Sequence, residues 1–154
     1  YVSDIFSPEM FSIISIAIIL VLMCLKKTNL AIFFLISIVG AVSTQFFLKK
    51  FVAILRPINS FITETGLSFP SGHATIPLVF FFFLFLLISQ LKIKNSLKIF
   101  SAVIFVFLTI LVSFSRLYLG VHYLSDILGG LTLGLFWLTF GFLAVNLFSQ
   151  KSVN

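Results

Sequence analysis

Five long apolar runs divide this chain, and they limit its possible folds more than any other feature. The runs cover residues 10–25, 30–48, 70–91, 99–114 and 122–148. Inside hydrocarbon every backbone polar group needs a partner, so only helices and closed β-barrels cross a bilayer. These runs do not alternate apolar with polar residues, as barrel strands do. The sequence therefore predicts an all-α fold, a polytopic membrane helical bundle with five visible spans.

The composition agrees with a membrane protein and argues against other classes. Only 9% of the 154 residues are charged, whereas soluble domains carry about 25%. The net charge of +6 does not indicate nucleic-acid binding, because the cations lie at helix ends and in short motifs. Cys24 is the only cysteine, which excludes an internal disulfide. We expect residues 1–154 to form a single domain within the bilayer, with no obligate protein partner.

Prolines mark two of the expected helix ends. The second helix should run past Lys49 as far as Arg56 and stop at Pro57, because the residue before a proline disfavours helical geometry. Residues 58–69 then form a polar loop. The third helix begins at Pro70 or just after it, since proline suits the first turn of a helix. His122 and the residues after it open the last helix.

The distribution of charges predicts the orientation of the bundle. Five spans place the polar segments alternately on the two sides of the membrane. One side carries Lys26, Lys27, Lys92, Lys94, Lys98 and Lys151, and the other carries Asp4, Glu9, Glu64 and Asp126. Because lysine and arginine are enriched on the cytoplasmic face, the six lysines mark the cytoplasm. The remaining cations, Lys49, Lys50, Arg56 and Arg116, lie on the acidic side. All of these except Lys50, which we interpret as an interface charge, belong to motifs.

Three polar motifs fall on that acidic side, and together they contain every histidine and arginine of the chain. They are Lys49 with Arg56-Pro57, then Pro70-Ser71-Gly72-His73, and finally Ser115-Arg116 with His122 and Asp126. An arginine alone at a span end is usually an interfacial side chain, and Asp126 alone could cap its helix. Such separate explanations do not account for the joint arrangement, which indicates one shared site facing away from the cytoplasm.

The cations and amides of these motifs suit a phosphate group. Arg56 and Arg116 offer planar forks that bind phosphate oxygens in pairs, and Lys49 adds a point charge. The start of a helix exposes backbone N–H groups that bind anions. We expect those groups to come from Ser71, Gly72 and His73, with the Ser71 hydroxyl as a further donor.

The two histidines suit the chemistry of phosphoryl transfer. His122 and Asp126 are four residues apart, which places them on one helical face. A carboxylate on one imidazole nitrogen fixes the tautomer and leaves the other nitrogen free to attack phosphorus. His73 is then placed to protonate the leaving oxygen.

The three motifs together resemble the signature of the type 2 phosphatidic acid phosphatase (PAP2) superfamily. The resemblance covers residues 49–126 and has no departure at any signature position. It implies a helical, metal-independent phosphatase without a cofactor, acting through a phosphohistidine. In that pattern His122 is the nucleophile, Asp126 its partner and His73 the general acid. The phosphate ligands are Lys49, Arg56, Ser71, Gly72 and Arg116. Membrane members usually have six spans, so we expect a further span before Tyr1.

The expected function is dephosphorylation of a lipid phosphate or diphosphate at the periplasmic face of a bacterial inner membrane. The short chain favours undecaprenyl diphosphate as substrate. Lipid A phosphate, phosphatidylglycerophosphate and phosphatidic acid remain as alternatives. A vanadate-dependent haloperoxidase would share the phosphate cradle, but those relatives are soluble. A lipid-phosphate binding or transport module without turnover would need neither His122 nor Asp126.

Overall fold

The computed structural model describes residues 8–151, and these residues form five α-helices joined by three short turns and one longer loop, residues 53–71. The helices are α2 (Pro8–Cys24), α3 (Thr28–Val52), α4 (Gly72–Ser89), α5 (Asn95–Tyr118) and α6 (Leu124–Lys151). The all-α bundle expected from the apolar runs is confirmed. Four of the helices, α3 to α6, are long and apolar enough to cross a membrane, whereas the apolar part of α2, Met10–Cys24, is shorter.

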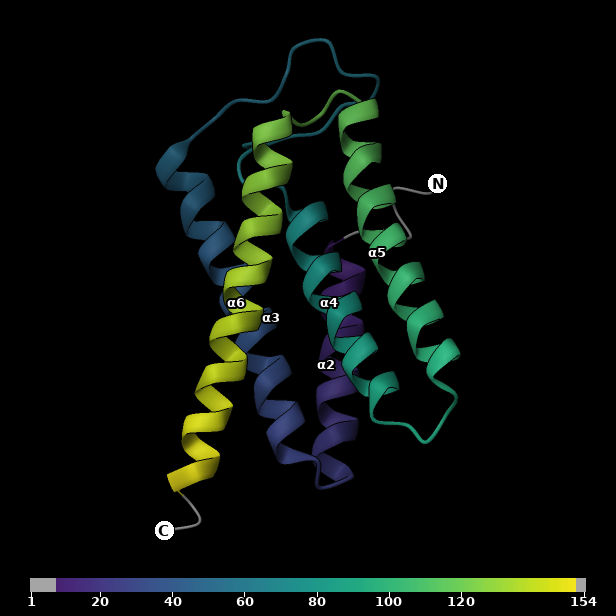
Figure 1. Ribbon diagram of the computed structural model, residues 1–154. Helices are drawn as coiled ribbons and strands as arrows, with labels where there is room; N and C mark the ends of the chain where they lie inside the picture. The colour runs from purple at the N-terminus through teal and green to yellow at the C-terminus, as the bar shows by residue number, and fades with distance from the viewer. Residues whose placement is uncertain (1–7, 152–154) are drawn as a thin grey trace.

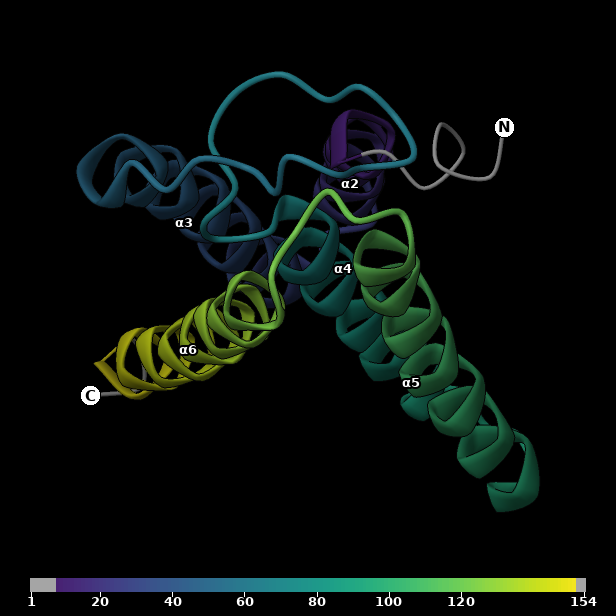
Figure 2. The ribbon, with the colours of Figure 1, turned by 90° about the horizontal axis from the view of Figure 1, so that it is seen from above.

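Helix α4 lies at the centre of the bundle and contacts each of the other four helices. Figure 1 shows α5 on one side of α4 and α6 on the other, with α2 and α3 behind. Seen from above, α5 and α6 diverge from the turn that joins them (Figure 2). The segment that joins α3 to α4 and the turn between α5 and α6 lie at the same end of the bundle.

Phenylalanines of α4 form much of the core. Phe83 is fully buried and stacks on Phe34 of α3, with ring centroids 3.9 Å apart. Phe80 and Phe81 both contact Phe11 of α2. Burying a phenylalanine side chain stabilises the fold by about 1.5–3 kcal/mol in soluble proteins. In a membrane bundle the tight packing itself supplies the attraction, because lipid tails are as apolar as the core.

Two glycines of α6 bring this helix close to α4. A methyl group at Gly130 would lie 2.6 Å from the backbone oxygen of Ser71. One at Gly134 would lie 3.2 Å from the backbone oxygen of Thr75. A side chain at either position would therefore push the two helices apart.

The end of α3 differs from the expectation. The helix ends at Val52, and Ala53 takes a left-handed conformation with φ of 53° and donates its N–H to the carbonyl of Lys49. This is a helix end of the kind usually made by glycine. Arg56 consequently lies in the loop that follows, so the expectation that Pro57 stops this helix is wrong.

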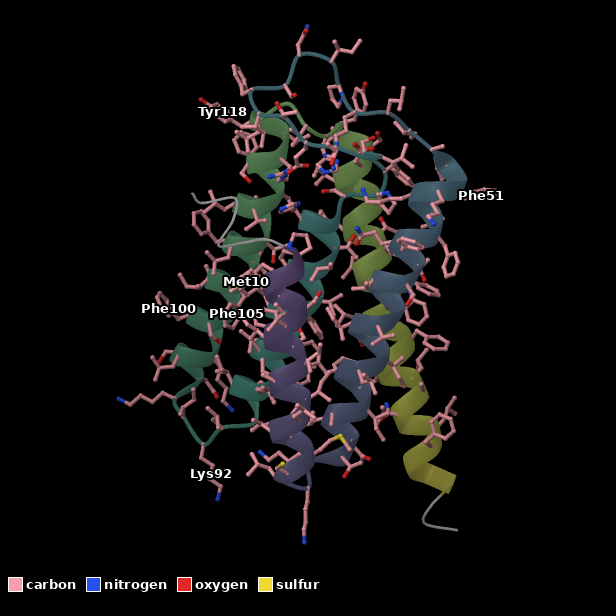
Figure 3. All side chains as sticks on the ribbon, turned by 180° about the vertical axis from the view of Figure 1, so that it is seen from behind. Met10, Phe51, Lys92, Phe100, Phe105 and Tyr118 are labelled. Atoms are coloured by element: carbon pink, nitrogen blue, oxygen red, sulfur yellow. The ribbon has the colours of Figure 1, made fainter. Side chains whose placement is uncertain are left out.

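The segments that carry charged residues lie at the two ends of the bundle. The α2–α3 turn with Lys26 and Lys27 lies at the same end as the α4–α5 turn, where Lys92 projects away from the bundle (Figure 3). Arg56 and Glu64 belong to the segment at the opposite end. Asp4 lies outside the described residues, as do the side chains of Glu9 and Lys151.

Candidate active site

The three sequence motifs meet at one end of the bundle. The loop 53–71 crosses above the first turn of α4, and the turn between α5 and α6 lies directly beside it (Figures 1 and 2). Backbone bonds hold this loop in place. Phe61 N–H donates to the carbonyl of Leu119 at 3.0 Å, and Ser68 N–H donates to that of Ile54 at 2.8 Å. The loop is therefore tied both to itself and to the end of α5.

Arg56 contacts the third motif from this loop. Its Nη1 donates to the backbone oxygen of Val121 at 3.0 Å and lies 3.3 Å from Nε2 of His122. The same nitrogen lies 2.7 Å from Oε2 of Glu64. The Arg56 side chain is only 16% exposed, so these contacts are largely shielded from water and from salt.

Arg116 comes from the last turn of α5 and pairs with the other oxygen of the same carboxylate. Its Nη2 contacts Oε1 of Glu64, and its side chain is only 1% exposed. Glu64 thus stands between the two arginines, with one oxygen on each. Phosphate oxygens bind to arginine with the same kind of charge-assisted hydrogen bonds, so this arrangement of two arginines could also hold a phosphate group.

His122 and Asp126 form a buried pair next to these arginines. His122 Nδ1 lies 3.2 Å from Oδ2 of Asp126. The same oxygen accepts the backbone N–H of Tyr123 at 2.8 Å. Because α6 begins at Leu124, His122 precedes the helix instead of lying on one of its faces, and the expected reason for the pairing is wrong. The turn brings the two side chains together, while Asp126 also caps the helix start.

The protonation state of His122 follows from its neighbours. Arginine is a donor only, so its approach to Nε2 requires a lone pair there and places the proton on Nδ1, toward Asp126. Burial lowers the pKa of His122 to about 3, and the positive charges of Arg56, Lys49, Arg116 and His73 contribute. The imidazole is therefore neutral at physiological pH, with the lone pair of Nε2 directed at Arg56.

The start of α4 differs from the expected anion cradle in two respects. The helix begins at Gly72, and Ser71 precedes it in an extended conformation, so Pro70 lies before the first turn and not in it. The N–H of Ser71 donates to the backbone oxygen of Asp126 at 3.0 Å and is not directed at a ligand. The buried Ser71 hydroxyl makes no hydrogen bond within the described residues, and it remains available as a donor.

Lys49 holds the backbone near the second motif. Its Nζ donates to the carbonyl of Leu67 at 2.6 Å and lies 3.5 Å from that of Ser68. His73 is half-buried in the first turn of α4. Every predicted site residue thus lies at this end of the bundle. Lys49, however, donates to backbone carbonyls of the loop in this structure.

Two residues of the site were not recognised in the sequence. The sequence indicated only that Glu64 is an acidic residue of a polar loop. In the structure it lies between Arg56 and Arg116. Gln45 of α3 is the other. A methyl group at Gly72 would lie 2.6 Å from its Nε2, and its buried Oε1 makes no hydrogen bond within the described residues. The position of Gln45 four residues before Lys49 was the available signal, since such residues share a helix face.

Fold and site together define a class of protein, a polytopic helical membrane protein with an anion-binding cradle beside a neutral, carboxylate-oriented histidine. A comparison of the sequence with models of known protein families agrees with this class. Residues 30–149 match the model of the PAP2 superfamily. The chain belongs to the PAP2 superfamily.

Two relatives give finer detail. The chain is 38% identical over 103 residues to phosphatidylglycerophosphatase B of Bacillus subtilis (strain 168). This match covers 62% of the chain but only 49% of the relative, so the chain matches about half the length of that protein. A crystal structure described as the first of a transmembrane PAP2-type phosphatidylglycerolphosphate phosphatase, also from Bacillus subtilis, aligns with a TM-score of 0.76 and 27% identity. The alignment covers 97% of this chain and 73% of that one.

Proposed function

We propose that this protein is a membrane lipid phosphatase that hydrolyses a phosphate monoester through a phosphohistidine. One observation carries the proposal. Two arginines from different segments converge on a single carboxylate, 2.7 Å from Arg56 Nη1, beside a neutral imidazole oriented by Asp126. An anion-binding site alone does not need an oriented nucleophile.

The first chemical step forms a bond between His122 Nε2 and phosphorus. The bond from phosphorus to the lipid oxygen breaks, and the oxygen keeps the electron pair of that bond. His73 then donates a proton to the same oxygen. Arg56 and Arg116 bind the phosphoryl oxygens on which negative charge accumulates. Asp126 accepts a hydrogen bond from Nδ1 and stabilises the positive charge that develops on the ring.

The second step returns the enzyme to its starting state. Water attacks phosphorus, the bond to Nε2 breaks, and His73, now neutral, takes a proton from the water. Phosphate leaves and the imidazole is again neutral. Among the described residues no group of three or more His, Cys, Asp or Glu side chains is placed to hold a metal ion. We expect the two arginines to stabilise the charge, with full activity in excess chelator.

The preferred substrate is phosphatidylglycerophosphate. Both relatives carry names that refer to this lipid, and these relatives favour it over the undecaprenyl diphosphate suggested by chain length. The cradle itself fits any terminal phosphate, so lipid A phosphate and phosphatidic acid remain poorer alternatives. We place the site on the periplasmic face of a bacterial inner membrane, because Lys26, Lys27, Lys92, Lys94 and Lys98 lie at the opposite end of the bundle.

Phosphate release from a lipid panel tests the proposal. Purified protein in detergent should release phosphate fastest from phosphatidylglycerophosphate, more slowly from phosphatidic acid and undecaprenyl diphosphate, and not from phosphatidylcholine. His122→Asn is the matched control, since it keeps a polar side chain of similar size. Absence of phosphate release from every lipid, or equal release by the control variant, would refute the proposal.

A further inference from the structure

Two adjoining cavities lie at the end of the bundle opposite the candidate active site. The inner cavity has a volume of about 250 Å³ and lies between α3, α4 and α6. The outer cavity, about 400 Å³, adjoins the turn between α2 and α3. Both cavities are lined by Asn29, Leu30 and Gln90, so they form one continuous cleft. That turn and the end of α4 lie at the lower end of the bundle in Figure 1.

The inner part of the cleft is apolar, and its mouth is polar. Phe33, Leu86, Phe142 and Val145 line the interior from three helices. Carboxamides from the same three regions surround the opening: Asn29 of α3, Gln90 at the end of α4 and Asn146 of α6. All three are exposed side chains without a hydrogen bond among the described residues. Such an opening suits a ligand with an apolar tail and a polar head.

The charge at the mouth has one sign. Lys26 and Lys27 line the outer cavity, and none of the residues lining either cavity is acidic. The nearest described turn at this end adds Lys92 and Lys94. Lysines next to a membrane attract anionic lipid headgroups and bind zwitterionic ones much less. In a bilayer, the apolar lining of the inner cavity would be covered by lipid acyl chains.

We infer that this cleft is a binding site for an anionic phospholipid of the leaflet opposite the active site. One acyl chain lies against Phe33 and Phe142. The headgroup phosphate contacts Lys26 and Lys27, and the carboxamides bind its ester and hydroxyl oxygens. The ligand is a phosphodiester lipid such as phosphatidylglycerol and is not turned over, because no histidine lines the cleft. The site is independent of the proposed catalytic activity.

Native mass spectrometry of the purified full chain tests the site without any assay of turnover. The protein is titrated with dioleoyl phosphatidylglycerol and, separately, with dioleoyl phosphatidylcholine. We expect tighter binding of phosphatidylglycerol to the unmodified protein. The double substitution Lys26→Gln with Lys27→Gln should weaken that binding by about tenfold to thirtyfold, while leaving phosphatidylcholine binding unchanged.

Two further variants separate a built site from general attraction. Lys92→Gln with Lys94→Gln removes the same charge from the neighbouring turn and should change binding less than threefold. Asn146→Leu keeps every charge and should weaken phosphatidylglycerol binding about threefold or more through the lost hydrogen bond. Glycerol phosphate, which has the headgroup without chains, should not compete. Equal losses in the two lysine pairs, no preference for phosphatidylglycerol, or competition by glycerol phosphate would overturn the inference.

Discussion

Arg56 Nη1 lies 2.7 Å from Oε2 of Glu64, so an arginine of the candidate phosphate site already holds a carboxylate of the same chain. Arg116 holds the other oxygen. We predict that a phosphate bound by these two nitrogens displaces Glu64. The ion pairs keep the two guanidinium groups converged on one carboxylate, and we expect them to compete with an anionic ligand.

The substitution Glu64→Gln should therefore strengthen ligand binding. Hydrogen bonds to charged groups contribute about 1.5–3 kcal/mol, so the KM for the lipid and the half-inhibitory vanadate concentration should each fall about tenfold. The value of kcat should stay within a factor of about three. Thr63→Val, an exposed neighbour in the same loop, serves as the control. A rise in KM would show that Glu64 helps to bind substrate and does not compete with it.

The two histidines should differ in their dependence on the leaving group. His122→Ala removes the nucleophile and should abolish activity on every substrate. His73→Ala removes only the proton donor, which contributes about 10²–10⁴-fold for a lipid alkoxide. Because a phenolate leaves without a proton, this variant should recover much of its relative rate on p-nitrophenyl phosphate. Steady-state rates on both substrates check the assignment, and rescue of His122→Ala by the better leaving group would reverse it.

The buried imidazole of His122 should make the folded protein less stable as the pH falls. The folded-state pKa of His122 is lowered to about 3, whereas the unfolded value is about 6.5. Between these values the unfolded chain binds a proton that the folded chain does not. Stability is therefore greatest above pH 6.5 and falls as the pH drops toward 3. The thermal midpoint should fall less between pH 7 and pH 4.5 in His122→Asn than in the unmodified protein, and an equal fall would contradict this origin.

The orientation can be tested by chemical labelling. In a Cys24→Ser background, Asn59→Cys places a thiol in the loop beside the site, and Asn95→Cys places one at the start of α5. An impermeant thiol reagent should label the first in intact spheroplasts and the second only after lysis. The reverse pattern would place the candidate active site in the cytoplasm.

The glycine contact between α4 and α6 should be sensitive to a single methyl group. Gly130→Ala places a carbon 2.6 Å from the backbone oxygen of Ser71, and backbone cannot move away as a side chain can. Overpacking of this kind costs about 1–3 kcal/mol. We expect a lower thermal midpoint together with reduced kcat. Leu128→Ala, at an exposed position of the same helix, should change kcat much less.

The sequence predicted the bundle and the position of the three motifs at one end of it, because both depend on local patterns. Apolar runs specify helices directly, and alternating spans bring the three motifs to one side. The end of α3 was not predictable, since Ala53 adopts a left-handed conformation that alanine rarely takes. The role of Glu64 depends on the path of the loop 53–71. That path is set by bonds such as Phe61 N–H to Leu119, which join residues far apart in the chain.

The backbone bond from Ser71 N–H to the Asp126 oxygen, at 3.0 Å, has a consequence for the history of such proteins. Neither atom belongs to a side chain, so we expect the bond to persist with any residue other than proline at position 71. A descendant that exchanged the carboxylate at 126 would lose its chemistry and still inherit the spacing between the start of α4 and the turn at His122. We therefore expect that the proposed activity can be lost by substitution at position 126 without loss of this contact between α4 and the α5–α6 turn.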